Sequence, residues 1–431
     1  MLCAMYFAQG LPWGFMVTAL VAFLTDEHGI NETEAGRLTA VVLWPWTFKL
    51  VWAPLIDTVT IRSMGRRRPW IIGAELLMAV SLLGILAMGD LSNNLSLLAW
   101  MFFIHNCFAS LQDVSTDALA IDILPANEQG LVNGLMWGTK LVGKAIGAFG
   151  MAYVIYEWGL SAAVLVQFIS LLIIMLFPLL CVERPGDRRL PWTRPIEPES
   201  AEDVLPQNRS TLRSPWVVLR DLVRGFSLKT TFFLLLYGVM HVIGWGIVEV
   251  VYKTLYTQQL GWTYVDISRF AFYAMFTEMA GAILGGVMAD RVGRRIVMVA
   301  GFGTYGLLAF VFGACPHLWH SDWFSASYLI LNPGALAFGA VGFLSMGMRI
   351  SWTKSSASMF TIYMTLSNVG HVIGNEIVGP LRTEYGFSFE HTFWWAALSM
   401  IAPLFLLFLV RPETVDAMRD QEALEQKAAE P

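Results

Sequence analysis

The feature that most constrains this chain is a succession of apolar runs, each about twenty residues long. The hydrocarbon core of a bilayer is about 30 Å thick, so a spanning helix needs roughly 20 apolar residues. Inside lipid, a helix is the structure that bonds every backbone group within such a run. We therefore predict an all-α membrane protein with twelve transmembrane helices, at residues 2–24, 35–55, 70–88, 97–123, 130–156, 160–182, 229–252, 266–288, 296–314, 325–348, 355–379 and 391–410.

The composition supports lipid as the main solvent of the surface. Hydrophobic residues make up 56% of the 431 residues and charged residues only 14%, whereas a soluble chain carries about 25% charged residues. Three of the four cysteines lie inside apolar runs, so no disulfide framework is indicated. No charged segment precedes the first run, which we interpret as helix one and not as a signal peptide. We expect a monomer in the bilayer, with no nucleic-acid partner.

Basic residues gather in alternate loops, which sets the predicted orientation. They are Arg62, Arg66, Arg67 and Arg68 after helix two, Arg291, Arg294 and Arg295 after helix eight, and Arg349 and Lys354 after helix ten. Loops rich in arginine and lysine face the cytoplasm, so both termini are predicted to be cytoplasmic. Residues 183–228 are rich in proline and charged residues, and we predict that they form a cytoplasmic linker with a short interfacial helix from Ser214. The predicted domains are therefore 1–182, 183–228, 229–410 and 411–431.

The two hydrophobic halves match each other. Each has six predicted helices, and a pattern of aspartate followed by basic residues occurs at Asp57–Arg68 and again at Asp290–Arg295. Pseudo-symmetric six-helix halves are an architecture of transporters, with the solute site near the midplane between them.

Residues 286–295, Gly-Val-Met-Ala-Asp-Arg-Val-Gly-Arg-Arg, resemble the cytoplasmic signature of the major facilitator superfamily. Gly286 allows close helix approach, Gly293 permits a tight turn, and Asp290 can bond the arginines. The resemblance implies a gating loop that latches the halves in one state of transport, and an ordinary basic loop is the alternative. The candidate gating residues are Asp57, Arg66, Arg67, Arg68, Gly286, Asp290, Arg291, Gly293, Arg294 and Arg295.

A narrower resemblance comes from the first half, mainly helices one to five. Residues 6–12, 48–57 and 65–70, with the acids of helix four, are similar to the AmpG-type muropeptide permeases and the related acetyl-coenzyme A transporters. The resemblance implies a proton-driven carrier of a large polar metabolite, such as a muropeptide, in a bacterial inner membrane. It implies no cofactor. An acetyl-coenzyme A or siderophore carrier of the same fold remains the alternative.

Four ionisable residues lie inside helices four and five. Placing a charge at the bilayer centre costs between about 2.5 and 17 kcal/mol, so such residues face the interior and pair. Asp113 and Asp117 share one helical face, as do Lys140 and Lys144, and depth matches Asp113 best with Lys140. We predict that one of the acids takes up a proton while the lysines hold an anionic group. A static ion-pair cluster is the alternative.

Further polar residues are candidates for the cavity. The side chain of Lys49 could lie in the cavity or extend to the inner membrane surface, and the sequence favours neither. Glu75 has no obvious partner in the sequence. Four deep tryptophans could stack on a sugar or adenine, or simply pack. The other candidate site residues are Gln112, Glu278, Asn368, His371, Asn375 and Glu376, and the deep tryptophans are Trp44, Trp46, Trp137 and Trp245.

An embedded acyltransferase is the competing function from another class. The sequence shows no nucleophile–base pair and no phosphate-cradling loop, so we expect a transporter and not an enzyme. Cys315, His317 and His320 have metal-like spacing but no fourth ligand, so no metal is expected.

Overall fold

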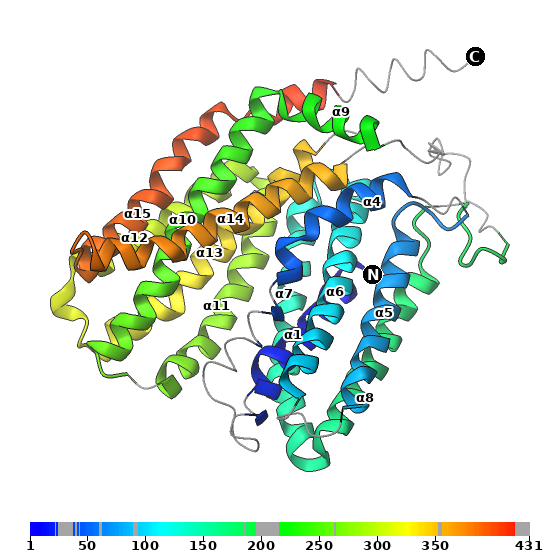
Figure 1. Ribbon diagram of the computed structural model, residues 1–431. Helices are drawn as coiled ribbons and strands as arrows, with labels where there is room; N and C mark the ends of the chain where they lie inside the picture. The colour runs from blue at the N-terminus through cyan, green and yellow to red at the C-terminus, as the bar shows by residue number, and fades with distance from the viewer. Residues whose placement is uncertain are drawn as a thin grey trace. The chain divides into compact units, whose positions relative to one another are not determined.

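The computed structural model of the chain describes residues 1–21, 23–24, 38, 41–42, 44–59, 63–88, 94–184, 186–194, 215–262, 264–351 and 356–418. Helices dominate these residues and no strand occurs among them (Figure 1). The predicted all-α class is therefore confirmed. Arg62, Lys354 and Ser214, on which the orientation and the linker helix partly rest, lie outside the described residues.

The chain forms two compact units, and the first comprises residues 1–124, 139–220 and 355–361. Within it, α5 packs against both α6 and α8, and α1 packs against α6 and η4. Figure 1 shows α5, α6 and α8 side by side. The elements of this unit are α1 (Leu2–Gly14), η1 (Phe15–Ala19), η2 (Lys49–Val51), α4 (Trp52–Thr58), α5 (Arg68–Leu86), α6 (Leu95–Ile123), η4 (Ile146–Gly150) and α8 (Met151–Leu180).

The second unit comprises residues 125–138, 221–354 and 362–431. Here α13 packs against α11 and α12, and α15 packs against α10 and α12. Its elements are α10 (Lys229–Gln258), α11 (Tyr264–Arg291), α12 (Arg294–Ala314), η6 (Pro316–Leu318), α13 (Asp322–Ile350), α15 (Phe389–Ile401) and η7 (Ala402–Leu409).

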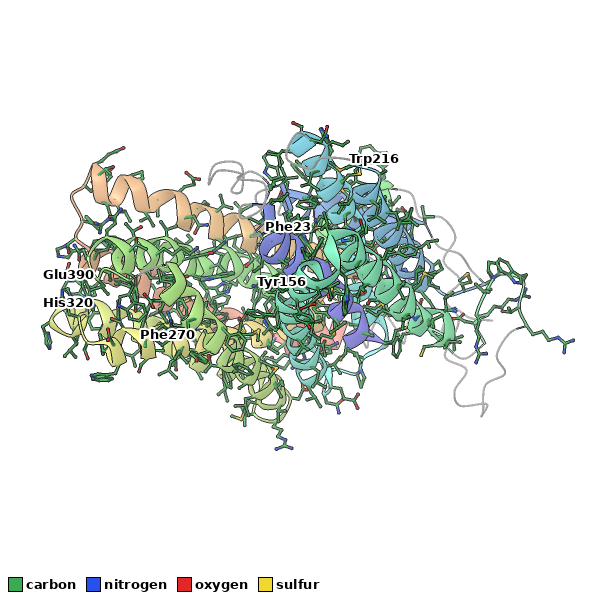
Figure 2. All side chains as sticks on the ribbon, turned by 90° about the horizontal axis from the view of Figure 1, so that it is seen from below. Phe23, Tyr156, Trp216, Phe270, His320 and Glu390 are labelled. Atoms are coloured by element: carbon green, nitrogen blue, oxygen red, sulfur yellow. The ribbon has the colours of Figure 1, made fainter. Side chains whose placement is uncertain are left out.

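Three helices contribute residues to both units: α7 (Gln129–Ala145), α9 (Pro215–Phe226) and α14 (Ser356–Thr383). Trp216 of α9 is exposed (Figure 2), and so are the apolar Val223 and the basic Arg220 and Arg224 of the same helix. This pattern fits an interfacial helix, and that placement stays a prediction, as do the domain limits.

Eight helices among the described residues are long and apolar enough to cross a membrane. One of these spans residues Gln129–Leu180 and so includes two of the predicted segments. Gly159 inside it has φ 80°, which breaks the helical geometry between them. The multi-pass membrane architecture is confirmed, and the count of twelve stays a prediction.

Glycines bring α1 against α7 and η4 at backbone contact. A Cβ atom on Gly14 would lie 2.0 Å from the carbonyl oxygen of Lys144, and one on Gly147 would lie 2.0 Å from that of Leu11. Both positions therefore exclude any side chain. Gly150, in contrast, has only the side chain of Ile146 nearby, at 3.5 Å. The close approach places the side chains of α7 next to those of α1.

Candidate functional site

Asp113 and Asp117 of α6 are buried in the first unit and have short polar contacts. Asp117 accepts a hydrogen bond of 2.6 Å from the hydroxyl of Tyr6 on α1. Asp113 forms an ion pair with Lys49, at 3.3 Å between Oδ2 and Nζ. The two charged side chains of that pair are only 5% and 9% exposed. The structure thus places Lys49 inside the bundle as the direct partner of Asp113, where depth in the sequence favoured Lys140.

Lys140 lies among aromatic rings of the same unit. Its Nζ donates a 2.9 Å hydrogen bond to Oε1 of Gln9. The ammonium is 4.6 Å from the ring centroid of Trp46, 5.3 Å from that of Tyr6 and 5.6 Å from that of Trp13. The rings of Trp13 and Trp46 are themselves 5.5 Å apart. A cation flanked by ring faces suits an anionic group carried by an extended, partly apolar molecule such as a sugar.

A buried chain of amides extends from Lys140 to a third acid. Nε2 of Gln9 donates to Oε1 of Gln112 at 2.7 Å, and Nε2 of Gln112 donates to Oε2 of Glu75 at 3.2 Å. Glu75 and Gln112 are completely buried, and Gln9 is 2% exposed. Lys144, one turn beyond Lys140, is exposed.

The candidate residues of the second half lie in the second unit. His371 contacts Glu249 at 2.8 Å between Nε2 and Oε2, and its ring stacks on Trp245 at 4.0 Å. Glu278 accepts a hydrogen bond from Trp137, at 3.4 Å. Asn375 is half-buried, while Asn368 and Glu376 are exposed. The roles predicted for these residues stay predictions.

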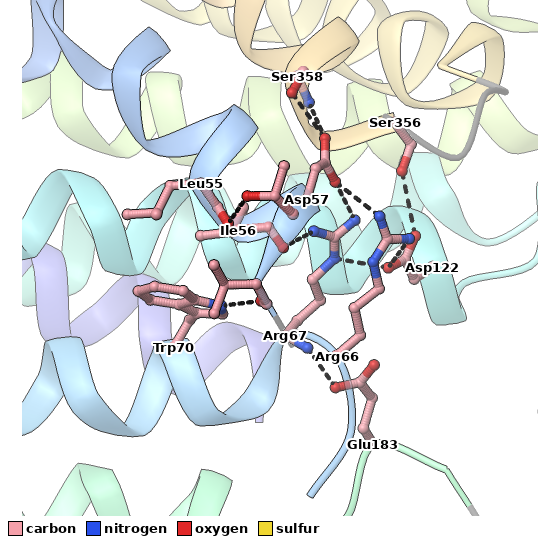
Figure 3. Close-up of polar contacts among 12 residues, drawn as sticks. Leu55, Ile56, Asp57, Arg66, Arg67, Trp70, Asp122, Glu183, Ser356 and Ser358 are labelled. Carbon is pink, nitrogen blue, oxygen red and sulfur yellow. Dashed lines mark hydrogen bonds and ion pairs between the residues drawn. The ribbon is translucent and has the colours of Figure 1, made fainter. Parts of the chain in front are cut away.

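A cluster of charges surrounds Asp57 at the end of α4 (Figure 3). Its Oδ1 is 3.0 Å from Arg66 and 2.8 Å from Arg67. Its Oδ2 accepts hydrogen bonds from the backbone N–H and the hydroxyl of Ser358, at 3.0 and 2.8 Å. Ser358 lies in the first turn of α14, where N–H groups lack partners in the helix. The carboxylate therefore interacts with both the arginines and the positive end of a helix dipole.

Arg67 is the cation at the centre of this cluster. It is completely buried and pairs with Asp122 at 2.8 Å as well as with Asp57. Burial acts to lower the pKa of Arg67, but the carboxylates of Asp122 and Asp57 outweigh that effect and raise the pKa above its ordinary value. The backbone N–H groups of Arg67 and Arg68 both bond Oε2 of Glu183, at 2.8 and 3.1 Å. Arg67 is thus held as a permanent cation.

Arg68 has a different environment from its neighbours. Within the part of the chain that the structure describes, its guanidinium donates to backbone carbonyls, including those of Met64 at 3.2 Å, Leu179 at 3.1 Å and Arg188 at 2.8 Å. These bonds tie the start of α5 to the end of α8 and the loop that follows it. We therefore assign Arg68 a structural role in the first unit.

The second copy of the motif repeats the helix contact. Asp290 accepts hydrogen bonds from the backbone N–H groups of Gly130 at 2.9 Å and Leu131 at 2.6 Å, in the first turn of α7. Its short contacts are with these groups and not with the arginines that follow it. A Cβ atom on Gly286 would lie 2.4 Å from the carbonyl oxygen of Gly130, so glycine is required there. Gly293 has φ 105° in the turn between α11 and α12.

The arginines of the second copy bond outside the motif. Arg294 donates to the hydroxyl of Ser345 at 2.5 Å and to the carbonyl of Ala126. Arg295 donates to the carbonyl of Val410. Arg291 is exposed. Each copy of the motif thus places one aspartate at the start of a helix.

Several contact residues were not among the sequence candidates: Tyr6, Gln9, Trp13, Ser358 and Glu183. Tyr6 and Gln9 belong to a segment that carried the resemblance, and an amide inside an apolar run is itself a signal of an interior position. Ser358 gives no such signal, because its contact with Asp57 depends on its position in the first turn of α14. Among the described residues, no group of three His, Cys, Asp or Glu side chains could hold a metal ion.

Comparison with known proteins identifies relatives over the whole chain. The model of the Major Facilitator Superfamily matches residues 2–375 and 234–430. The anhydromuropeptide permease of Escherichia coli (strain K12) is 27% identical over 452 residues, which cover 99% of this chain and 82% of that protein.

Solved transporters share the fold. The fucose:proton symporter of Escherichia coli matches with a TM-score of 0.70 at 11% identity, over 95% of this chain and 97% of that one. The human organic anion transporter MFSD10 matches with a TM-score of 0.67 at 14% identity, over 94% and 96%.

Proposed function

This chain belongs to the major facilitator superfamily and is a multi-pass membrane transporter, and we propose that it is a proton-coupled carrier of a large anionic metabolite. The proposed substrate is a muropeptide, which joins sugar rings to a peptide with carboxylate groups. The proposed location is a bacterial inner membrane, with both termini in the cytoplasm. The membership also excludes the embedded acyltransferase as a description of the chain.

The observation that carries the proposed substrate class is the environment of Lys140. Its ammonium lies 4.6 Å from the ring of Trp46, with Trp13 and Tyr6 also within 6 Å. Aromatic faces bind the apolar faces of sugar rings, and the ammonium binds a carboxylate. The similarity to an anhydromuropeptide permease supports the same substrate class.

Proton coupling is supported by the two buried acids of α6. The ion pair between Asp113 and Lys49 compensates both charges while both are desolvated. Protonation of Asp113 would leave Lys49 without its counter-ion, so the pair has two arrangements that differ by one proton. Asp117 has the hydroxyl of Tyr6 as its donor and can exchange a proton without losing that partner. Either acid can therefore couple a proton to a rearrangement of the site.

Alternating access needs contacts that form in one state and break in another. The contacts of Asp57 with Ser358 and of Asp290 with Gly130 suit this role, because a helix terminus can separate from a carboxylate without breaking a helix. We propose that these two contacts are the latch of the transport cycle.

Uptake by proteoliposomes tests the proposal. Purified protein would be offered labelled anhydromuropeptide, acetyl-coenzyme A and a siderophore, each with and without an inward proton gradient. We expect accumulation of the anhydromuropeptide only with the gradient, and its loss in Asp113→Asn or Asp117→Asn. Accumulation of acetyl-coenzyme A or the siderophore in its place would show that the proposed substrate is wrong. Equal uptake with and without the gradient would contradict proton coupling.

A further inference from the structure

Glu75 of α5 is a buried acid that the proposed mechanism does not use. Its side chain is 0% exposed. Among the described residues, its Oε2 accepts one hydrogen bond, from Gln112, and its Oε1 accepts none. No lysine, arginine or histidine of the described residues forms an ion pair with it. Asp113 and Asp117 of α6 differ from Glu75 in this respect, because Asp113 has Lys49 and Asp117 has the hydroxyl of Tyr6.

An ionised carboxylate in this position would lack compensation. The effective penalty for burying one unpaired ion is several kcal/mol even after relaxation, and one neutral amide donor offsets only part of it. Adding a proton removes the charge and with it most of that penalty. The geometry around Glu75 thus favours a carboxyl group that holds a proton.

The hydrogen bonds from Lys140 to Glu75 have one fixed direction. An ammonium can only donate, so Gln9 must present its carbonyl oxygen to Lys140 and its amino group to the next residue. Gln112 then accepts from Gln9 and donates onward to Glu75. All the donors in the chain point away from Lys140. Hydrogen bonds arranged in this way polarise one another, so the ammonium strengthens the donor that faces Glu75.

We propose that Glu75 is a proton-binding residue of the transport cycle, linked to the anion bound at Lys140 through Gln9 and Gln112. When a substrate carboxylate neutralises the charge of Lys140, the polarisation of the amide chain falls and Oε2 of Glu75 faces a weaker donor. Proton binding at Glu75 then becomes more favourable. Because linkage is reciprocal, a proton on Glu75 favours the anion at Lys140 by the same factor. Proton and anion therefore bind together, as a symporter requires.

Other groups near Glu75 have their own partners. Facing α5 from α6, His105 contacts the hydroxyl of Ser81 and the carbonyl of Met78, at 3.0 and 3.1 Å. The charged groups on α6 are Asp113, Asp117 and Asp122, which have Lys49, the hydroxyl of Tyr6 and Arg67 as their partners. The helix α8 places the uncharged, completely buried Gln167 in the same unit. Lys140 is then the cation that the amide chain connects to Glu75.

This inference rests on the proposed transport of an anion with protons. Its first test uses no substrate, so that its result does not depend on whether the proposed substrate is correct. Infrared spectra of the purified protein in lipid at neutral pH report the C=O stretch of a protonated carboxylic acid. We expect this band in the unaltered protein, its loss in Glu75→Gln, and no change in Glu157→Gln, which alters an exposed acid. Glutamine keeps the shape of Glu75 and an acceptor for Gln112. An unchanged band in Glu75→Gln would overturn the proposal.

Transport supplies the second test, with labelled anhydromuropeptide as the probe. We expect Glu75→Gln to retain exchange of internal for external probe but to lose accumulation against a gradient. Gln112→Leu leaves Glu75 in place and should keep the infrared band while reducing accumulation. Accumulation at the unaltered rate in Glu75→Gln would overturn the proposal. If even the unaltered protein exchanges no probe, the proposed substrate is wrong, and the infrared band alone decides the role of Glu75.

Discussion

Asp57 forms ion pairs with two arginines and accepts hydrogen bonds from the first turn of α14. Removing one partner of a buried charge pair costs about 3–5 kcal/mol, because the other charge stays buried. We predict that Asp57→Asn lowers the free energy of unfolding by an amount in this range and slows uptake. Denaturant titration in detergent micelles measures the first effect.

The matched control for Asp57→Asn is Arg291→Gln. Arg291 belongs to the second copy of the motif but is exposed, and exposed charges contribute about 0–1 kcal/mol. Equal stabilities of Asp57→Asn and the unaltered protein would show that the cluster around Arg67 is not held together by this carboxylate.

Trp46 gives a second prediction about a single residue. A cation above an aromatic ring gains about 0.5–2 kcal/mol, which corresponds to about 2- to 30-fold in affinity. We expect Trp46→Leu to raise the half-saturation concentration for the anhydromuropeptide within this range, because Lys140 loses the ring that positions it. Trp44→Leu alters an exposed ring two residues earlier and should leave the concentration unchanged. Equal effects of the two variants would contradict a binding role for Trp46.

Residue types in the site could be predicted from the sequence better than their partners. A charged side chain inside an apolar run is conspicuous, and Asp113, Lys49 and Lys140 were all recognised in this way. Which lysine pairs with Asp113 depends on the rotation of each helix about its axis. Tertiary packing determines this rotation, and it cannot be read from the sequence. For the same reason the hydrogen bonds that join Gln9 to Gln112 could not be predicted, and of these two residues only Gln112 was a candidate.

At the level of elements, the contact of α1 with α7 and η4 allows a sharp test. Placing a methyl group 2.0 Å from a backbone oxygen forces two helices apart, and overpacking of this kind typically costs 1–3 kcal/mol. We predict that Gly14→Ala and Gly147→Ala each lower the free energy of unfolding by about that amount.

Gly150→Ala serves as the control on the same helical segment, since its nearest neighbour is a flexible side chain at 3.5 Å. If Gly14→Ala were as stable as Gly150→Ala, the helices would not approach as closely as described. The sequence could not show which glycines make this contact, because that depends on the rotation of each helix about its axis. The π-helical turns η1 and η4 escaped prediction, because one extra residue in a turn does not alter an apolar run.

For the whole molecule, the duplicated motif and the alternating basic loops gave the transporter architecture from the sequence alone. The orientation of the chain is the prediction that belongs to this scale. With both termini cytoplasmic, green fluorescent protein fused after Pro431 should fluoresce in a bacterial host, because it folds in the cytoplasm. Alkaline phosphatase at the same position should be inactive, since it needs an oxidising compartment to form its disulfides. Active alkaline phosphatase at this position would show that the C-terminus lies outside the cytoplasm and that the predicted orientation is wrong.

Proton movement that accompanies the solute tests the central claim most directly. Membrane vesicles holding the protein, without any imposed gradient, would be given unlabelled anhydromuropeptide while the external pH is recorded. The account predicts that the external medium becomes more alkaline as the solute enters, and that Glu75→Gln abolishes this pH change while exchange continues. Entry of the solute with no change in external pH would contradict the account.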